Sequence, residues 1–445
     1  MLEGIPRSDG RKGIRNYLAV AYLVECAHHV AREIVQPYRE DGAQVIGFPG
    51  CYPNDYAQTM MERLCTHPNV GAVLLVSLGC ESFNRFKLEQ AIAATGRPVK
   101  TVVIQRSGGT RTAIQTGRDW VGAQLPALAA ADKVAMDISE LVVGTVCGGS
   151  DGTSGLTGNP AVGIAFDQLV EAGAACIFEE TGELIGCEGI MAARAKTPEL
   201  AAELTASVDK AAAYYATLGY GSFAAGNAEG GLSSIEEKSM GAYAKSGSSQ
   251  ISGLIKPGDI PPRGGLYLMD VVPDGEVRFG FPNISDNAEI VEMMASGAHL
   301  TLFVTARGSV VGSALAPVIK VCANPETYAR MAEDMDVDAG RILSGTPLAE
   351  VGNEIFDLTL AVANGTATKS EALGHAEFIL TYKSFEPIGP ACLPIGGDVF
   401  GATDWKNLPC DRRGARDRPR KRRGLPARGR DRLGNRCQRG GLGRA

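Results

Sequence analysis

Short, wholly apolar runs recur along the N-terminal part of this chain, and each is followed by a segment long enough for a helix. Strands that are apolar throughout are typical of parallel sheets, which are buried on both faces. Their alternation with helices predicts a doubly wound α/β fold, in which a mostly parallel sheet carries helices on both faces. Each crossover between neighbouring strands is expected to be right-handed. The runs are residues 16–24, 44–48, 72–78, 100–105, 141–146 and 175–179.

A segment rich in glycine, serine and proline, at about residues 220–262, interrupts this alternation. Strands are expected to resume after it, at residues 265–271 and 299–305. Because such residues punctuate regular structure, the segment is interpreted as a domain boundary. We therefore expect two α/β catalytic domains, one over residues 1–220 and one over residues 221–396.

The net charge of −6 conceals two parts of opposite sign. Residues 411–445 contain 14 basic and 3 acidic residues, so the rest of the chain carries a net charge of −17. An acidic body argues against nucleic-acid binding, because phosphate contacts need a basic face. The tail is rich in arginine, glycine and proline and has few apolar residues with which to form a core. Residues 397–445 are therefore predicted to be a basic, disordered tail.

The chain offers no sign of membrane insertion or secretion. No apolar run reaches the roughly 18 residues that a membrane span needs, and the N-terminal sequence MLEGIPRSDGRKG lacks the apolar region of a signal peptide. The eleven cysteines are an odd number and form no CxxC pair, which favours reduced thiols over disulfides. These features predict a cytoplasmic protein.

Four cysteines come directly after predicted strands: Cys26, Cys51, Cys80 and Cys147. In open α/β sheets, ligands bind at the carboxyl ends of the strands. Four thiols at one such edge could hold iron, either as Fe²⁺ or, as a second choice, in an iron–sulfur cluster. The alternative interpretation is that each cysteine is a small apolar core residue. The sequence leaves both open.

Cys147 also begins the sequence CGGSDGTSG, which is predicted to turn from a strand into a helix. Glycines let the backbone approach a ligand closely, and free N–H groups at a helix start favour an anion. A purely structural turn with a helix cap is the alternative. The candidate substrate-binding residues of this loop are Gly148, Gly149, Ser150, Asp151 and Ser154.

Three cationic residues could bind an anionic substrate. Lys238 and Lys245 lie in IEEKSMGAYAKSG, and Arg307 lies beside Ser309 in a second turn of glycine and serine, TARGSVVGS. Ammonium and guanidinium groups are the usual partners of carboxylates and related anions. Arg307 could instead pack against the fold, but the turn composition favours anion binding.

Candidates for proton transfer are His28, Glu188 and Lys238. His28 begins a predicted helix directly after Cys26, where it is a base, a metal ligand or a surface residue. Glu188 belongs to a group of carboxylates that includes Glu179 and Glu180. Clustered carboxylates suit metal binding or proton abstraction, and solvated surface charge is the alternative.

Collinear segments between about residues 4 and 394 resemble the altronate/galactarate dehydratase family. Among them are DGRKGIRNYLAV, THPNVGAVLLVSLGCE, CGGSDGTSGLTGNPAVG and IEEKSMGAYAKSG. The resemblance implies a lyase that removes a proton beside a carboxylate with the help of ferrous iron. YLVECAHHVA, GFPGCYPNDYAQ and FEETGELIGCE are similar to the sulfolactate sulfo-lyase branch of the family. That branch implies elimination of sulfite from (2R)-3-sulfolactate to give pyruvate.

The branch also implies a partner. Its large subunit acts with a separate small alpha subunit of about 100 residues, and an active site between two such parts is a common arrangement. We expect a homo- or hetero-oligomer that binds a small anionic hydroxy acid. A sugar-acid dehydratase is the alternative function. A catalytically degenerate member is another, because Gly189 follows Glu188 where the family commonly has histidine.

Overall fold

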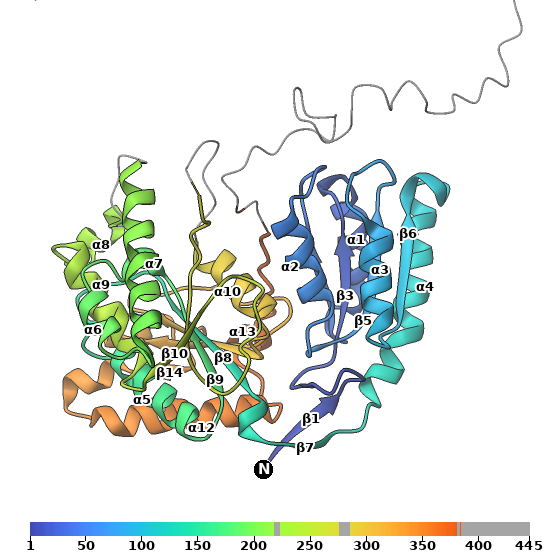
Figure 1. Cartoon of the computed structure of the whole chain (residues 1–445). Coiled ribbons are helices and arrows are strands. Elements are labelled where there is room, and N and C mark those ends of the chain that lie inside the picture. Colours follow the sequence, from blue (N-terminus) through green and yellow to red (C-terminus); the bar gives the residue numbers. More distant parts are fainter. Residues whose placement is uncertain (218–222, 276–284, 381–382, 384–445) are drawn as a thin grey trace, which may run out of the picture. The chain divides into compact units, whose positions relative to one another are not determined.

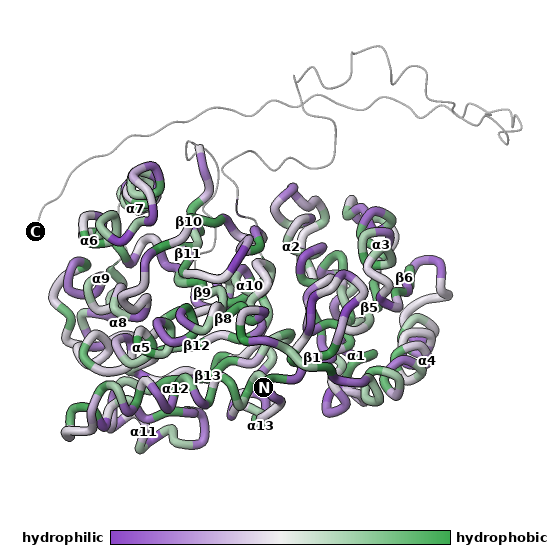
Figure 2. Tube along the Cα trace, turned by 60° about the horizontal axis from the view of Figure 1, so that its bottom comes forward, coloured by the Kyte–Doolittle hydropathy of each residue, from purple (hydrophilic) through white to green (hydrophobic). Residues whose placement is uncertain are grey.

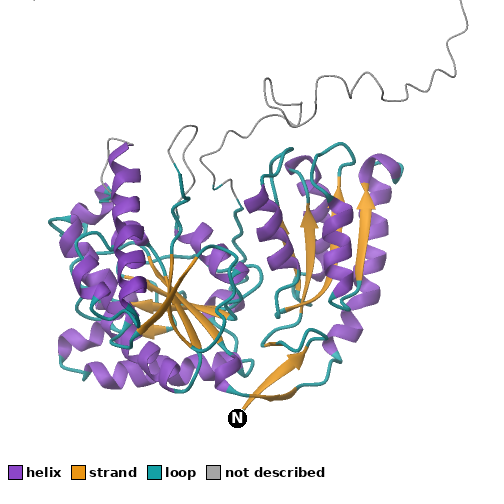
Figure 3. Ribbon diagram, viewed as in Figure 1, coloured by secondary structure: helices purple, strands orange, loops and turns teal. Residues whose placement is uncertain are grey.

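The computed structural model describes residues 1–217, 223–275, 285–380 and 383. Two parallel sheets with flanking helices dominate these residues, and a small antiparallel sheet accompanies them (Figures 1 and 3). The predicted α/β class, mostly parallel with helices on both faces, is confirmed. The predicted basic tail, residues 397–445, lies outside the described residues.

The first parallel sheet has four strands, and its strand β5 is buried along its whole length. In spatial order the strands are β4 (Ala43–Gly47), β3 (Tyr17–Tyr22), β5 (Val70–Ser77) and β6 (Val99–Val103), and all neighbours are parallel. Two helices contribute apolar side chains to the core on one face, α1 (His28–Val35) and α4 (Thr110–Ala129). The helices of the other face are α2 (Asp55–Cys65) and α3 (Arg85–Ala94).

The second parallel sheet has seven strands, all parallel to their neighbours. In spatial order they are β10 (Ile251–Ile255), β11 (Gly265–Met269), β9 (Ala175–Phe178), β8 (Val142–Cys147), β12 (Leu300–Thr305), β13 (Val318–Cys322) and β14 (Val337–Asp338). The helices that share one core with this sheet are α5 (Gly158–Glu171), α7 (Pro198–Thr217) and α12 (Leu348–Ala363). Helix α10 (Asp286–Ala295) belongs to the core on the other face.

Shorter elements complete the described part. Strand β1 (Leu2–Pro6) pairs in antiparallel fashion with β2 (Lys12–Gly13) and β7 (Val134–Met136). The remaining α-helices are α6 (Glu188–Ala192), α8 (Ala225–Glu229), α9 (Ile235–Tyr243), α11 (Pro325–Arg330) and α13 (Lys369–Ala372). In Figure 2 the longer helices α4, α7 and α12 each carry hydrophilic and hydrophobic residues, as helices with one buried side do. None of the helices in the described residues is long and apolar enough to cross a membrane.

The domain boundary expected near residue 220 falls inside the part of the chain that forms the seven-stranded sheet. Strands β8 and β9, before that point, pair with β12 and β11, after it. The change from one parallel sheet to the other comes earlier, between β6 and β8. The described part of the segment 220–262 contains α8, α9 and β10, so its glycine, serine and proline punctuate short elements of one domain, which composition alone does not distinguish from a domain boundary.

The strand order of the larger sheet reverses beside β8. The chain proceeds from β8 to β9, β10 and β11 on one side, and then crosses to β12, β13 and β14 on the other. At such a switch point, loops from adjacent strands leave in different directions and open a crevice at the carboxyl ends. The ends of β8, β9 and β12 are therefore where the fold itself favours a ligand.

Candidate active site

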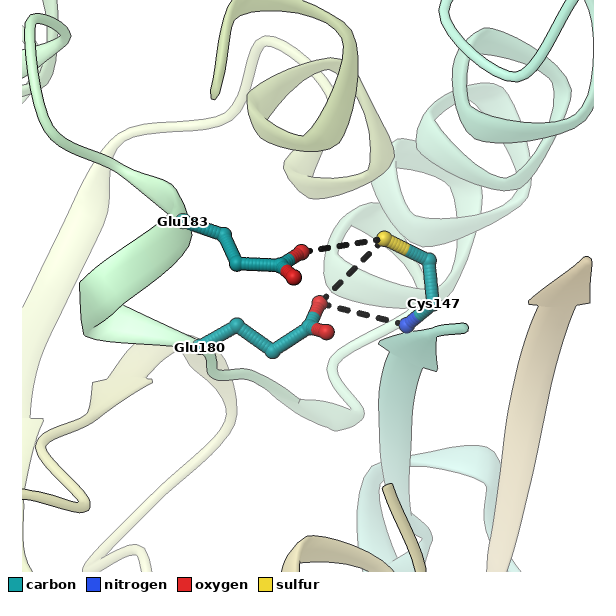
Figure 4. A group of neighbouring side chains, drawn as sticks. All are labelled: Cys147, Glu180 and Glu183. Carbon is teal, nitrogen blue, oxygen red and sulfur yellow. Dashed lines mark hydrogen bonds between the residues drawn. The ribbon is translucent and has the colours of Figure 1, made fainter. Parts of the chain in front are cut away.

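Cys147, the last residue of β8, meets two glutamates that follow β9. Its N–H donates a hydrogen bond to Glu180 Oε2 at 3.2 Å, and its thiol donates to the same oxygen at 3.3 Å. The thiol also lies 3.7 Å from Glu183 Oε2 (Figure 4). The three side chains thus converge at the carboxyl ends of β8 and β9, which are neighbouring strands of the sheet.

Glu180 has an unusual backbone. Its φ of 81° makes it the one non-glycine residue with positive φ in the described part of the chain. This left-handed conformation costs a non-glycine residue roughly 1–2 kcal/mol. It lets Glu179 and Glu180, which are consecutive, both remain buried, whereas successive side chains of a strand would point to opposite faces. Strain of this kind is typical of functional sites.

Two buried lysines face these acids. Lys245 forms an ion pair with Glu180, and its Nζ also lies 3.4 Å from Cys147 Sγ. Lys238 forms an ion pair with Glu183. The two lysines are seven residues apart, on α9 and the turn that continues it, so they lie on the same side two turns apart. Ser234 caps the start of α9 by accepting the N–H of Glu237 at 3.3 Å.

Three further acids of the site have no comparable cationic partner. Burial raises the pKa of Glu179 well above its usual range, and the charge of Glu289 raises it further. Burial also raises the pKa of Glu289 to about 7, although Lys383 opposes the shift. At the start of α10, burial and then repulsion by Glu183 raise the pKa of Asp286 to about 6. The carboxyls of Asp286 and Glu289 can therefore hold or release a proton near neutral pH.

Lys238 differs from these acids in remaining charged. Burial alone would lower the pKa of Lys238, but pairing with Glu183 outweighs it and raises that pKa. Burial also raises the pKa of the Cys147 thiol, against the opposing effect of Lys245. The site therefore presents two ammonium groups, a neutral thiol and several carboxyls of differing acidity.

A pocket of about 270 Å³ opens onto this cluster. Its acidic lining comes from two places in the chain, the turn after β9 and the start of α10. The residues that line it are Glu180, Gly182, Glu183, Tyr215, Ala224, Val271, Val272, Ser285, Asp286 and Glu289. The pocket therefore gives a small molecule access to Asp286 and Glu289.

The glycine-rich loop after β8 lines a second pocket, of about 310 Å³, together with α9. Ser150, Asp151 and Ser154 are among its walls, and Lys238 is shared with the acid cluster. A Cβ atom on Gly148 would lie 1.8 Å from Asp286 Oδ2, so only glycine lets that carboxyl approach the loop. The loop thus contributes by admitting Asp286 as well as by forming a wall.

Several residues predicted from the sequence are therefore brought together. Cys147, Lys238 and Lys245 form the charged cluster, and the glycine-rich loop lies against it. Gly149 adopts a φ of 64° and accepts the N–H of Arg307 at 2.9 Å through its carbonyl, which ties the loop to the end of β12. Their roles in binding substrate stay predictions.

Four other candidates line neither pocket. The imidazole of His28 is 2.9 Å from Glu25 Oε1, and Glu188 accepts the N–H of Gly186 at 2.9 Å. Arg307 pairs with Glu229 at 3.0 Å, and Ser309 accepts the N–H of Val311 at 3.1 Å. Their predicted catalytic and substrate-binding roles stay predictions without support from this geometry.

The expectation that four cysteines share one sheet edge is wrong for Cys147. Cys26, Cys51 and Cys80 follow strands β3, β4 and β5 of the four-stranded sheet and are exposed. Cys147 ends a strand of the seven-stranded sheet and is buried. Each thiol does follow a strand, but the sequence does not state which strands share a sheet.

Sequence reasoning assigned no role to Glu183, Asp286 or Glu289, and treated Glu179 and Glu180 only as a general carboxylate cluster. A signal was present in the segment SDNAEIVEMMA, where acids recur every third residue in an otherwise apolar helix. Glu289 and Glu292 are both buried on that helix. Acids at the core positions of a helix are rare without a function or a partner.

The two halves of the chain match two models of one family. Residues 4–129 match the model described as D-galactarate dehydratase/altronate hydrolase, second domain, and residues 138–385 match D-galactarate/altronate dehydratase, C-terminal. The chain belongs to the D-galactarate/altronate dehydratase family. The interval between the two matches coincides with the change from the four-stranded to the seven-stranded sheet.

Three members of the family illustrate its range. The chain is 34% identical to the (2R)-sulfolactate sulfo-lyase subunit beta of Chromohalobacter salexigens, over 85% of this chain and 96% of that protein. It is 26% identical to the altronate dehydratase of Escherichia coli K12, over 82% of this chain and 74% of that protein. It is 29% identical to the galactarate dehydratase of the same organism, over 82% and 72%. One of these relatives is named as a sulfo-lyase subunit and the other two as dehydratases, and both names denote enzymes of the lyase class.

Proposed function

We propose that this chain is the large subunit of a lyase that eliminates sulfite from (2R)-3-sulfolactate to give pyruvate. The observation that carries the proposal is the likeness to a sulfo-lyase subunit over 96% of that protein's length. The buried cluster supports it, because it places ammonium groups beside carboxyls that titrate near neutral pH. A doubly charged anion with an acidic C–H bond needs both kinds of group.

The reaction requires one proton transfer and one bond cleavage. The proton on C2, beside the substrate carboxylate, is removed, and the electron pair of that C–H bond forms the C2–C3 double bond. The C3–S bond breaks with its electrons, and sulfite leaves. The resulting enol takes up a proton at C3 and loses its hydroxyl proton, which gives pyruvate. The protein must therefore supply a base and stabilise negative charge that builds up on the carboxylate.

Asp286 is the proposed base. It lines the pocket, and its Oδ2 lies against the backbone of Gly148, which has no side chain to block it. A pKa of about 6 leaves the carboxyl mostly ionised at neutral pH and still able to hold a proton. The sequence predicts that Lys238 takes part in proton transfer. We propose an electrostatic role for it instead, because its pKa is raised and it stays charged.

The two lysines are proposed to bind the anionic ends of the substrate. Lys238 belongs both to the acid cluster and to the wall of the glycine-loop pocket, so its charge reaches both spaces. Lys245 is fully buried beside Glu180 and Cys147. A positive charge that is fixed before the substrate arrives stabilises developing negative charge without rearrangement.

The family resemblance implies Fe²⁺, and the residues present fit a divalent cation. Oxygens of Glu179, Glu180 and Glu289 lie within 4.8 Å of one another, and so do the ligand atoms of Cys147, Glu180 and Glu183. Neither oxygen of Glu179 has an N–H or hydroxyl donor among the described residues, and its carboxyl faces that of Glu289. Carboxylates suit hard divalent ions, and the thiol is a softer donor that suits iron. A bound ion would supply Lewis acidity toward the substrate carboxylate.

A partner subunit is part of the proposal. The relative that this chain matches over most of its length is named as a subunit beta, which supports a second chain in the active enzyme. We propose a small alpha subunit of about 100 residues that completes the active site, since sites between two chains are common. It would exclude water from the pocket and so strengthen the electrostatic contacts inside it.

A sugar-acid dehydratase is the second candidate, supported by the likeness to the altronate and galactarate dehydratases over 82% of this chain. The degenerate alternative rested on Gly189, which stands where the family commonly has histidine. Gly189 is exposed, with nothing within 4 Å of where its Cβ would be, and it lines neither pocket. The departure therefore leaves the buried cluster complete, which favours an active enzyme.

The test is a comparison of substrates with the partner present. The chain, co-expressed with its small subunit and purified without oxygen, is supplied with Fe²⁺ and with sulfolactate, altronate or galactarate. We expect sulfolactate to give equal amounts of sulfite and pyruvate, and altronate and galactarate to give no product. Dehydration of a sugar acid without sulfite release would favour the second candidate, and no product from any of the three would favour a degenerate member.

A further inference from the structure

The loops that follow strands β3, β4 and β5 each carry one exposed cysteine: Cys26, Cys51 and Cys80. The other five cysteines of the described residues are buried. Cysteine is among the most frequently buried residue types, so its exposure at this one edge needs an explanation. None of the three is in a disulfide.

The three loops are neighbours in space. Strand β3 lies between β4 and β5, so the strand ends span about 10 Å at the usual spacing of neighbouring strands. Hydrogen bonds join the loops directly: Glu25 donates its N–H to Pro49 O at 3.0 Å, and Ser82 donates its N–H to Cys51 O at 2.9 Å. The loop of Cys51 is therefore held to the loops of both other cysteines.

The spacing of the thiols is too wide for one metal ion. The three sulfur atoms do not all lie within 4.8 Å of one another. Two thiolates on a single zinc ion, each about 2.3 Å from the metal, cannot be more than about 4.6 Å apart. A cluster of several irons separates its thiolate ligands more widely, so a polynuclear site is compatible with this spacing.

The surroundings of Cys80 suit an anionic cluster. Gln105 Nε2 donates to Cys80 Sγ at 3.4 Å, and hydrogen bonds to cluster sulfurs stabilise the reduced state. The adjacent carboxylate of Glu81 is turned away and buried, where it accepts hydrogen bonds from Ser77 Oγ and, at 2.8 Å, from Gly79 N. Its negative charge is thereby stabilised by hydrogen bonds within the loop.

We propose that Cys26, Cys51 and Cys80 hold a [4Fe–4S] cluster at the carboxyl edge of the four-stranded sheet. It is distinct from the ion site of the acid cluster, which belongs to the other sheet. Three cysteines leave one iron without a protein thiolate, and that iron is open to an oxygen ligand from a small molecule. The Cys51 loop leads into α2, whose Tyr56 donates to Glu292 Oε1 of α10 at 2.5 Å. This contact connects the cluster to the helix that carries Asp286 and Glu289.

The experiment measures the cluster itself and does not depend on the proposed substrate. The full chain is produced and purified without oxygen, and its iron, acid-labile sulfide, visible absorption and electron paramagnetic resonance after reduction are recorded. We expect about four sulfides per chain, with the four irons that this cluster type requires and up to one more where the acid cluster holds its own ion. Zinc without sulfide, or iron without sulfide, would overturn the proposal.

Variants then assign the ligands. The triple variant Cys26→Ser, Cys51→Ser, Cys80→Ser should lose the sulfide and the resonance signal, and each single variant should lose most of both. The matched control is Cys147→Ser, which should retain the sulfide because this cysteine belongs to the other sheet. Circular dichroism establishes that the triple variant is folded. A folded triple variant that keeps its sulfide would show that the cluster is held elsewhere.

Discussion

The Nζ atom of Lys245 lies 3.4 Å from the Sγ atom of Cys147, and the same ammonium group is ion-paired with Glu180. All three side chains are buried. A buried cation with two potential anions beside it is costly to assemble, because each charge loses its hydration. The arrangement is therefore better understood as a site prepared for chemistry than as a contribution to stability.

Removing the charge of Lys245 should expose this cost. Lys245→Met leaves Glu180 buried without its partner, which typically costs 3–5 kcal/mol. Urea unfolding should show that loss. The double variant Lys245→Met, Glu180→Gln should recover most of it. Lys12→Met is the control, because its pair with Glu140 is partly exposed and should be worth less than about 1 kcal/mol. Equal losses of stability in Lys245→Met and Lys12→Met would contradict the assignment of Lys245 and Glu180 as a buried ion pair.

Asp286 should govern the pH dependence of the reaction. The active form of a general base is the deprotonated one, and its pKa is raised to about 6. We therefore expect kcat/KM to rise as pH increases through about 6 and then to level off. Asp286→Asn should lower kcat by about 100-fold or more and remove this rise. An unchanged pH profile in a slower variant would instead indicate that Asp286 only positions other groups.

Lys238 should contribute more to substrate binding than Arg307. Lys238 lines the glycine-loop pocket and contacts the acid cluster, whereas Arg307 is exposed and paired with Glu229. Lys238→Met should lower kcat/KM by tenfold or more, which corresponds to about 1.4 kcal/mol. Arg307→Met serves as the matched loss of one positive charge, and its kcat/KM should change by less. A larger fall in kcat/KM in Arg307→Met than in Lys238→Met would indicate that the substrate binds at the Arg307 turn instead.

The sequence predicted the fold well because the relevant information is local. Runs such as AVLLVSL are typical of buried strands, and their alternation with helices leads to parallel sheets. It also led to Cys147, Lys238 and Lys245, because unusual residues beside glycine-rich turns stand out. It did not lead to Asp286 or Glu289, since the burial of an acid depends on what packs against its helix. The sequence also does not state which strands share a sheet, so it placed Cys147 with three cysteines of another sheet.

Two buried histidines should make the fold sensitive to acid. His67 Nδ1 accepts the N–H of Asn69 at 3.1 Å, and His299 Nδ1 accepts the N–H of Val142 at 3.0 Å, so both rings are held neutral. Burial lowers the pKa of His299 to about 4 and that of His67 well below its usual value. Because the unfolded chain binds these protons more readily, the stabilisation is present above about pH 6.5 and is lost as pH falls toward 4.

For His299 the loss amounts to about 3 kcal/mol. It should appear as a fall in the urea midpoint between pH 7 and pH 4.5. In His299→Gln, an amide can replace the ring without taking up a proton, so the fall should be smaller. The same fall in the variant and the parent would assign the acid sensitivity to other groups.

Glu179 should stabilise a bound ion at the expense of the ion-free fold. Its carboxyl is buried beside that of Glu289 with no N–H or hydroxyl donor among the described residues, and burial raises its pKa well above the usual range. A group with a raised folded-state pKa destabilises the fold progressively as pH rises above its unfolded value. Glu179→Gln removes that ionisation, so the ion-free variant should gain stability over the parent at pH 8 and gain less at pH 5. The added thermal stability that Fe²⁺ or Mn²⁺ gives the parent should shrink in the variant, because one ligand is lost. Glu62→Gln is the control, because this half-buried residue of α2 lines neither pocket of the site, and it should change neither quantity. A variant that is less stable than the parent at pH 8, yet stabilised by the ions to the same extent, would remove Glu179 from the ion site.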